Sequence, residues 1–398
     1  MSSSHSPTRK ALSSVIAAGC SIYGKRIGQS SKDLLNESLD ELFSSCPKLA
    51  VEDIDAFYLG QAFPESFEHQ ANPSPGCAIG YGMNRIPSVR VDTVSSSGGS
   101  SLRQGILGIM SGEFNVVICA GVEKMSGAST EQAVEVISMA SDRPFEQWNG
   151  ATLASLNALS AREHMRRYGT AEEDMALVSV KNHENAYENP KAYLHKKVSV
   201  EDVLSSRKIS TPLKLLDCSP ICDGASCVAL SRPELAEQLC ENPIDIVGSA
   251  ESSDLDFVFR EEITSFRSTR EAAHEAYSRS ELKPTDIDFF ELHDAFTINE
   301  IIAYEDIGLC KAGEGGKLAR SGKTRVDGDF PVNPSGGLKA KGHPVGSSGI
   351  GQAYEVFMQL SGKVKTPSRA VRGAKRALTH SMGGAGVTAQ VHIFSARF

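Results

Sequence analysis

Apolar positions along the chain follow two alternating patterns. Short apolar runs at 115–120 and 227–230 predict buried strands, while Leu102, Ile106 and Ile109 recur at the spacing of one helical face. Strands and helices alternate in this way twice along the sequence. The alternation predicts an α/β protein with two similar halves, each built on a buried mixed sheet.

Two pairs of similar segments indicate a duplication. Asp53–Phe57 and Asp286–Phe290 each predict a short strand that leads into a loop with an Ala-Phe pair. A longer pair, Gly98–Met110 and Gly346–Met358, shares four identical residues at one constant offset, 346 − 98 = 248. Because both pairs recur in the same order, duplication explains them better than chance does.

The stretch between the halves has a different composition. It holds a helical segment at 151–168 with the basic residues Arg162, Arg166 and Arg167, and a polar run follows at 182–197. The arginines meet either a phosphate-rich ligand or solvent, and a solvated helix face is the commoner outcome. We predict the first part of the N-terminal half at 1–124, an inserted loop domain at 125–215, the return of the N-terminal half at 216–242 and the C-terminal half at 243–398.

Charge and cysteine content narrow the class of protein. A net charge of −8 over 398 residues, without a basic stripe, is atypical of nucleic-acid binding, and no apolar run reaches the length of a membrane span. The nine scattered cysteines do not predict a disulfide framework. Cys218 and Cys222 lie four residues apart, which is not the spacing of a zinc ribbon, so no zinc site is predicted. Because Met1–Lys10 lacks the apolar core of a signal and Ala396–Phe398 is a poor peroxisomal address, we expect a cytoplasmic protein.

Four loops carry the candidate chemistry. Ser95 precedes the first repeated helix and His343 precedes the second at the same offset, 343 − 95 = 248, so a pseudo-twofold would let them face one another. His293 follows a predicted strand and has Asp294 beside it. The sequence leaves open whether His293 has a functional role or only forms an ion pair with Asp294. The glycine-rich loop 379–384 can aim N–H groups at an oxyanion. This set predicts acyl transfer; no role is assigned to His5, His195 or His274.

These loops are also the ones by which thiolases are known. The chain resembles the sterol carrier protein-type thiolases, and most closely the archaeal acetoacetyl-CoA thiolases, over nearly its whole length. The resemblance includes Gly121–Met125, Val180–His183, Leu216–Pro220 and Asn333–Gly337. It implies a thiolase fold, in which two βαβαβαββ halves form five α-β-α-β-α layers with an inserted loop domain.

The resemblance also implies substrates and partners. Acyl-CoA thioesters would be the substrates. Coenzyme A would therefore be part of the substrate, and neither a metal nor another cofactor is expected. The chain would form a homodimer or homotetramer. In the mevalonate pathway, archaeal relatives work with 3-hydroxy-3-methylglutaryl-CoA synthase and a small zinc-containing bridging protein.

The family's catalytic residues map onto this sequence with two departures. A cysteine that takes the acyl group is replaced by Ser95, while His343 would activate the nucleophile and His293 would help to hold the oxyanion. A second cysteine, which moves the α-proton, is replaced by Ser381 in the loop that includes Gly383. Some relatives instead place a sulfur where this chain has Ala295. Ala295, Phe296 and His380 are expected to line the substrate site.

Three functions remain open from the sequence. The first is an acetyl-CoA C-acetyltransferase, active or inactivated by Ser95, which performs Claisen condensation or the reverse thiolysis. The second is a non-catalytic subunit that binds CoA esters or scaffolds an assembly. The third, a Ser–His hydrolase, ranks last because no G-x-S-x-G surrounds Ser95. Acyl-chain preference, reaction direction and whether Ser95 is native or an introduced Cys→Ser change also stay open.

Overall fold

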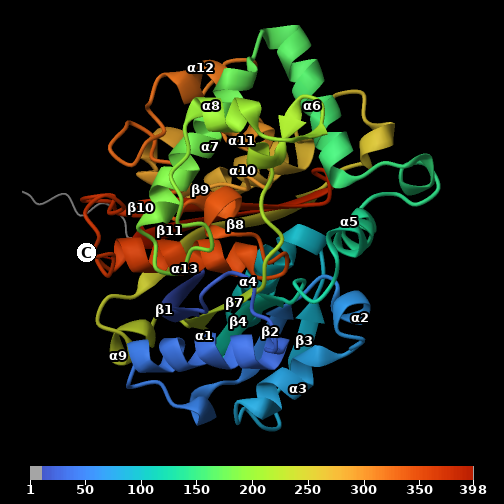
Figure 1. Cartoon of the computed structure of the whole chain (residues 1–398). Helices are drawn as coiled ribbons and strands as arrows, with labels where there is room; N and C mark the ends of the chain where they lie inside the picture. Colours follow the sequence, from blue (N-terminus) through green and yellow to red (C-terminus); the bar gives the residue numbers. More distant parts are fainter. Residues whose placement is uncertain (1–10, 398) are drawn as a thin grey trace, which may run out of the picture.

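A central nine-stranded sheet organises the chain in the computed structural model, which describes residues 11–397 (Figure 1). His5, the rest of the segment Met1–Lys10 and Phe398 lie outside the described residues. The strand order is β3-β2-β4-β7-β1-β8-β11-β10-β9. The strands are β1 (Ser13–Cys20), β2 (Ala56–Gly60), β3 (Ser88–Val91), β4 (Val116–Glu123), β7 (Gly224–Ser231), β8 (Ile244–Ser253), β9 (Phe289–Glu291), β10 (Arg376–Gly383) and β11 (Thr388–Ala396).

The sheet has the internal symmetry that the repeated segments predict. In the first half β2 and β4 pair in parallel and β4 pairs antiparallel with β7; in the second half β9, β10 and β11 repeat this pattern. Val332 forms a parallel bridge with Phe290 where the first half has β3. The halves meet where β1 and β8 pair antiparallel. The predicted strand at 115–120 lies largely in β4, and the one at 227–230 lies within β7.

The repeated helices form the middle of five layers. Figure 1 shows α4 (Ser97–Met110) and α13 (Ser348–Leu360) between the two halves of the sheet. Helix α1 (Ser31–Ser45) covers the outer face of the first half, and α10 (Arg267–Ser280) covers that of the second. The thiolase fold is therefore present.

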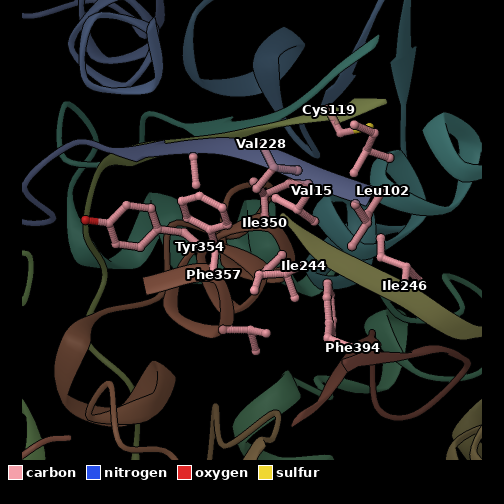
Figure 2. Close-up of a cluster of buried hydrophobic side chains, with 14 of the residues drawn as sticks. Val15, Leu102, Cys119, Val228, Ile244, Ile246, Ile350, Tyr354, Phe357 and Phe394 are labelled. Carbon is pink, nitrogen blue, oxygen red and sulfur yellow. The ribbon is translucent and has the colours of Figure 1, made fainter. Parts of the chain in front are cut away.

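Buried apolar side chains from both central helices fill the space between the sheet halves. Figure 2 shows Leu102 of α4 and Ile350 of α13 packed among strand residues such as Val228 and Ile244. Both helices carry glycines where they cross: a Cβ built on Gly349 would lie 2.3 Å from the backbone nitrogen of Gly99. The central helices approach one another this closely only because side chains are absent at the crossing.

The segment between β4 and β7 is mainly helical and leaves the sheet. In it Arg166 and Arg167 both pair with Glu163, so these arginines are engaged on an exposed helix face. The segment contains α5 (Thr130–Ser138), α6 (Leu153–Tyr168), α7 (Glu172–Tyr187), α8 (Val200–Ser205), β5 (Lys208–Ser210) and β6 (Leu213–Lys214). The α-helices not yet named are α2 (Pro64–Phe67), α3 (Pro73–Gly80), α9 (Ala236–Leu239), α11 (Thr297–Asp306) and α12 (Gly315–Arg320).

Within residues 11–397 no helix is both long and apolar enough to cross a membrane.

Candidate active site

Ser95 lies in a tight turn that leads directly into α4. The turn, Val94–Ser96, is a 3-10 helix, and Ser95 is buried to 4% exposure. Val94 has φ +57°, an unfavourable conformation for a β-branched residue. Asp92 accepts the N–H of Val94 at 2.8 Å, and the Ser97 hydroxyl donates to the Val94 carbonyl at 2.6 Å. Local hydrogen bonds thus hold Ser95 at the positive end of the α4 dipole.

Three of the predicted histidines meet beside one another. The rings of His293 and His343 pack edge to face with centroids 5.4 Å apart, and those of His293 and His380 lie 6.4 Å apart. All three are almost fully buried. They come from the loop after β9, the turn before α13 and strand β10, so the second half of the fold supplies all three rings.

We assign the proton of the neutral His343 ring to Nδ1 from the contacts of the Ser348 hydroxyl. Ser348 donates its single hydroxyl proton to the Pro344 carbonyl at 2.9 Å, and the same oxygen lies 2.7 Å from His343 Nδ1. With the hydroxyl proton directed at the Pro344 carbonyl, we assign the hydroxyl oxygen as the acceptor for an Nδ1–H of His343. The other nitrogen, Nε2, is left with a lone pair and can act as a base.

His293 takes the opposite tautomer. Its Nδ1 accepts the backbone N–H of Met382 at 3.3 Å, so the neutral ring carries its proton on Nε2 and can donate to a substrate oxygen. His380 in turn accepts the backbone N–H of His293 through Nδ1 at 3.4 Å, and its Nε2 bonds Thr269 Oγ1 at 2.9 Å. Both nitrogens of His380 are thus engaged, and this residue positions His293.

Burial keeps the three rings neutral. Desolvation lowers the pKa of His343 and that of His380 to about 3. The pKa of His293 is also lowered, first by burial and then by the two neighbouring histidines. Near neutral pH the cluster therefore offers one free basic nitrogen and one N–H donor, a pairing suited to moving a proton while an oxyanion forms.

Asp294 supports the turn before His343 and makes no ion pair with His293. Its carboxylate accepts the N–H groups of Leu338 at 2.6 Å and Lys339 at 3.2 Å, at the start of a π-helical turn, Gly337–Lys341. Burial is the main cause that raises the pKa of Asp294. Gly337 has φ +61°, and a Cβ there would lie 2.2 Å from Asp294 Oδ2. Asp294 thus links the loop of His293 to the approach to His343.

The structure places Ser381 away from the histidine cluster. Its hydroxyl donates to Gln390 Oε1 at 3.2 Å and lies against Gly99 of α4, because neighbouring side chains of β10 point to opposite faces. His380 is the residue of β10 that lies beside His293, and the proton-transfer role of Ser381 stays a prediction. Gly383 packs against the nucleophile turn: a Cβ there would lie 2.2 Å from the Thr93 carbonyl.

The remaining predicted residues line the same region from the loop after β9. The Ala295 carbonyl accepts the N–H of Ser219 at 2.8 Å, and Phe296 forms a backbone bridge with Cys218. Sequence reasoning did not single out Ser348 and Thr269, which hold His343 and His380. For Ser348 the signal existed, because it is one of the identical positions of the repeat.

A large cleft in the described part of the chain lies elsewhere. It encloses about 900 Å³ between α7 and the segments 325–331 and 367–374, and none of the predicted site residues lines it. The candidate site is therefore defined by its chemistry. In the described part of the chain, no group of three or more His, Cys, Asp or Glu residues is arranged to hold a metal ion.

Two family models match the chain. Residues 14–234 match the model described as "Thiolase, N-terminal domain", and residues 249–396 match "Thiolase C-terminal domain-like". The chain belongs to the thiolase family. The boundary between the two matches falls at the junction of the sheet halves.

Similar proteins include two named acetyl-CoA acetyltransferase and one named sterol carrier protein 2. The protein of Methanothermobacter thermautotrophicus is 46% identical over 344 residues, which cover 86% of this chain and 89% of that protein. The protein of Methanocaldococcus jannaschii, with the same name, is 39% identical over 350 residues, with 86% and 89% covered. Sterol carrier protein 2 of Oryctolagus cuniculus is 34% identical over 320 residues, covering 76% and 57%. These relatives support a thiolase-type acyltransferase function.

Solved structures share the fold. A structure titled "Ltp2-ChsH2(DUF35) aldolase" aligns with a TM-score of 0.85 at 24% identity, covering 98% of this chain and 99% of that one. Human mitochondrial 3-ketoacyl-CoA thiolase aligns with a TM-score of 0.75 at 17% identity, covering 98% and 100%.

Proposed function

We propose that the chain is a thiolase of the acetyl-CoA C-acetyltransferase type, whose substrates are short acyl-CoA thioesters and whose rate is limited by Ser95. The observation that carries the proposal is the pair His343 and His293, which hold opposite tautomers beside one another. One supplies a base and the other a hydrogen-bond donor, the two groups that acyl transfer needs around a nucleophile.

In the thiolysis direction, Ser95 Oγ attacks the 3-keto carbon of acetoacetyl-CoA while His343 Nε2 takes the hydroxyl proton. The C2–C3 bond then breaks, and its electron pair leaves on C2 as the enolate of acetyl-CoA. Nε2–H of His293 donates to the oxygen on which this charge accumulates. A proton returns to C2, and the thiol of free CoA attacks the acyl group on Ser95 to release the second acetyl-CoA.

The serine slows this sequence at two steps. A cysteine thiol, with a pKa of about 8.5, ionises readily at a helix N-terminus beside a histidine, whereas a serine hydroxyl needs a base throughout. The resulting oxygen ester is also a poorer acyl donor than a thioester. We infer a site arranged for thiolase chemistry. Oxygen in place of sulfur at residue 95 slows both the attack on the substrate and the transfer of the acyl group to CoA.

A second candidate is a non-catalytic subunit that binds CoA esters. It is favoured by the engagement of both His380 nitrogens and by the hydrogen bond of the Ser381 hydroxyl to Gln390, so neither residue offers a free acid–base group. The two functions differ in one respect that can be measured, since only the enzyme acylates Ser95.

The partners belong to the same proposal. We infer a homodimer or homotetramer in the cytoplasm that supplies the mevalonate pathway together with 3-hydroxy-3-methylglutaryl-CoA synthase and a small zinc-containing bridging protein. One fold neighbour, the "Ltp2-ChsH2(DUF35) aldolase", includes a DUF35 protein, and this supports a search for such a partner.

The test is intact-protein mass spectrometry after incubation with acetyl-CoA and an acid quench. The enzyme proposal predicts the added mass of one acetyl group, located at Ser95 and lost in His343→Ala. Acetyl-CoA binding by calorimetry without any ester, in the wild type and in Ser95→Cys, would instead establish the binding subunit.

A further inference from the structure

Glu123 is a buried carboxylate that three backbone amides surround. It ends β4, is 0% exposed, and accepts the N–H groups of Ala62 at 3.0 Å, Phe63 at 3.1 Å and Gly346 at 2.9 Å. In the described part of the chain no lysine or arginine forms an ion pair with it. Three amide dipoles therefore stabilise its charge.

The three amides belong to different halves of the fold. Ala62 and Phe63 follow β2 in the first half, whereas Gly346 lies in the second half, three residues after His343 and just before α13. Gly346 is tightly packed at this contact, because a Cβ on Gly346 would lie 2.6 Å from the Val122 carbonyl oxygen and 2.7 Å from the Gly60 carbonyl oxygen. Glu123 thus joins the turn of His343 to the sheet half that carries Ser95.

Glu123 also interacts electrostatically with Asp92, the residue that holds the nucleophile turn. Burial, with a smaller effect from Asp92, raises the pKa of Glu123 to about 7. Asp92 is the residue that accepts the N–H of Val94 and contacts the Ser97 hydroxyl. Glu123 therefore contacts the turn of His343 directly, and it affects the nucleophile turn through the charge of Asp92.

We propose that Glu123 is a positioning residue that sets the approach of His343 Nε2 to the side chain at position 95. The proposal rests on the proposed function, since it assumes that His343 activates this side chain. Without the carboxylate, three buried N–H groups lose their acceptor and the turn 342–346 is free to shift. A displacement of about 1 Å between a base and a nucleophile can cost about 10²-fold in rate.

Glu123→Gln is the informative substitution because it keeps the shape of the side chain. Its amide oxygen can still accept from one side, but its NH₂ group must face at least one backbone N–H, so two donors oppose each other. Glu305→Gln is the matched control. Glu305 is also a buried glutamate that accepts two backbone N–H groups, those of Gly313 and Gly315, both at 2.8 Å, but it lies near the far end of α11.

The readout is alkylation by iodoacetamide of the thiol that Ser95→Cys introduces, with the labelled peptide followed by mass spectrometry at pH 7. This rate reports activation by His343 and requires no turnover. In the Ser95→Cys background, we expect Glu123→Gln to slow alkylation about tenfold, which corresponds to about 1.4 kcal/mol. His343→Ala should slow alkylation at least as much. Glu305→Gln should leave the alkylation rate within about twofold of the Ser95→Cys parent. Where turnover is measurable, kcat falls and KM for acetoacetyl-CoA stays within about twofold.

The possible results separate the two proposals. An alkylation rate that depends on His343 but not on Glu123 overturns the positioning role and leaves the proposed function standing. A rate that depends on neither residue overturns both. If Glu123→Gln does not fold, Glu123→Asp, which keeps the charge but is one methylene shorter, replaces it, and an unchanged rate in that variant contradicts the positioning role.

Discussion

At the residue scale, hydrogen bonds separate the roles of histidines that share the same burial. His343 and His293 both have lowered pKa values, yet Ser348 makes one a base and Met382 makes the other a donor. Sequence analysis singled out His343 from its repeat offset to Ser95, and His293 from its place in a loop after a strand. Their tautomers depend on partners whose positions only the folded chain defines.

Ser348→Ala tests the tautomer of His343. Loss of the acceptor for Nδ1–H lets the proton move to Nε2, so the base is lost from part of the population. We expect alkylation at position 95, in the Ser95→Cys background, to slow about tenfold, as for other residues that orient a functional histidine. Ser361→Ala, which removes a hydroxyl at the end of α13, is the control. Equal rates in all variants would show that Ser348 does not set the tautomer.

His392 gives a pH dependence of stability with a defined sign. Burial lowers the pKa of His392 to about 3 from 6.5, so its contribution to stability is fully present above pH 6.5 and is lost as the pH falls toward 3. For this group alone the loss between pH 7 and pH 5 is about 2 kcal/mol. His392→Gln keeps a donor for the Gly99 carbonyl, which His392 Nε2 contacts at 3.1 Å. The gap in unfolding free energy between wild type and variant, from urea titrations, should shrink by this amount at pH 5; a constant gap contradicts the neutral assignment.

At the element scale, the crossing of α4 and α13 brings the two catalytic turns together. Gly349→Ala would place a Cβ 2.3 Å from a backbone nitrogen of α4, so the helices must separate. We expect a loss of about 3 kcal/mol in unfolding free energy and a fall in activity. Gly80→Ala in α3, where a Cβ meets nothing within 4 Å, should instead stabilise by about 0.5 kcal/mol. Thermal and urea unfolding of both variants decide the point; equal stabilities would contradict a tight crossing.

The elements also show where sequence reasoning reached its limit. The offset of 248 predicted both central helices, since local apolar periodicity survives in each copy. Helix 151–168 was predicted for the same reason and is found as α6, Leu153–Tyr168. Ser381 was assigned from its place before a glycine-rich turn. Its direction depends on the register of β10 with β11, which pairs it with Gln390 and which no local pattern encodes.

At the scale of the whole molecule, the contacts that complete the site span the sequence. Glu123 and Gly346 are 223 residues apart, and Thr269 and His380 are 111 apart. Neither residue type nor spacing marks such pairs, so Glu123 and Thr269 were not predicted as parts of the site. The symmetric strand order was predictable in outline, whereas the pairing of β1 with β8 that joins the halves was not.

The oligomeric state is a further prediction at this scale. Strand β3 is an edge of the sheet with Val89 50% exposed, and free strand edges favour association. We expect light scattering after gel filtration to give at least twice the chain mass. A monomer mass at micromolar concentration would contradict the predicted homodimer or homotetramer.

The most direct test of the central claim is thiolysis of acetoacetyl-CoA, followed by loss of the enolate absorbance, in the wild type and in Ser95→Cys. The account predicts that Ser95→Cys is at least about 10²-fold faster, and that His343→Ala removes this gain. Equal, negligible rates in both proteins, with acetyl-CoA still bound, would contradict a thiolase site limited by its serine.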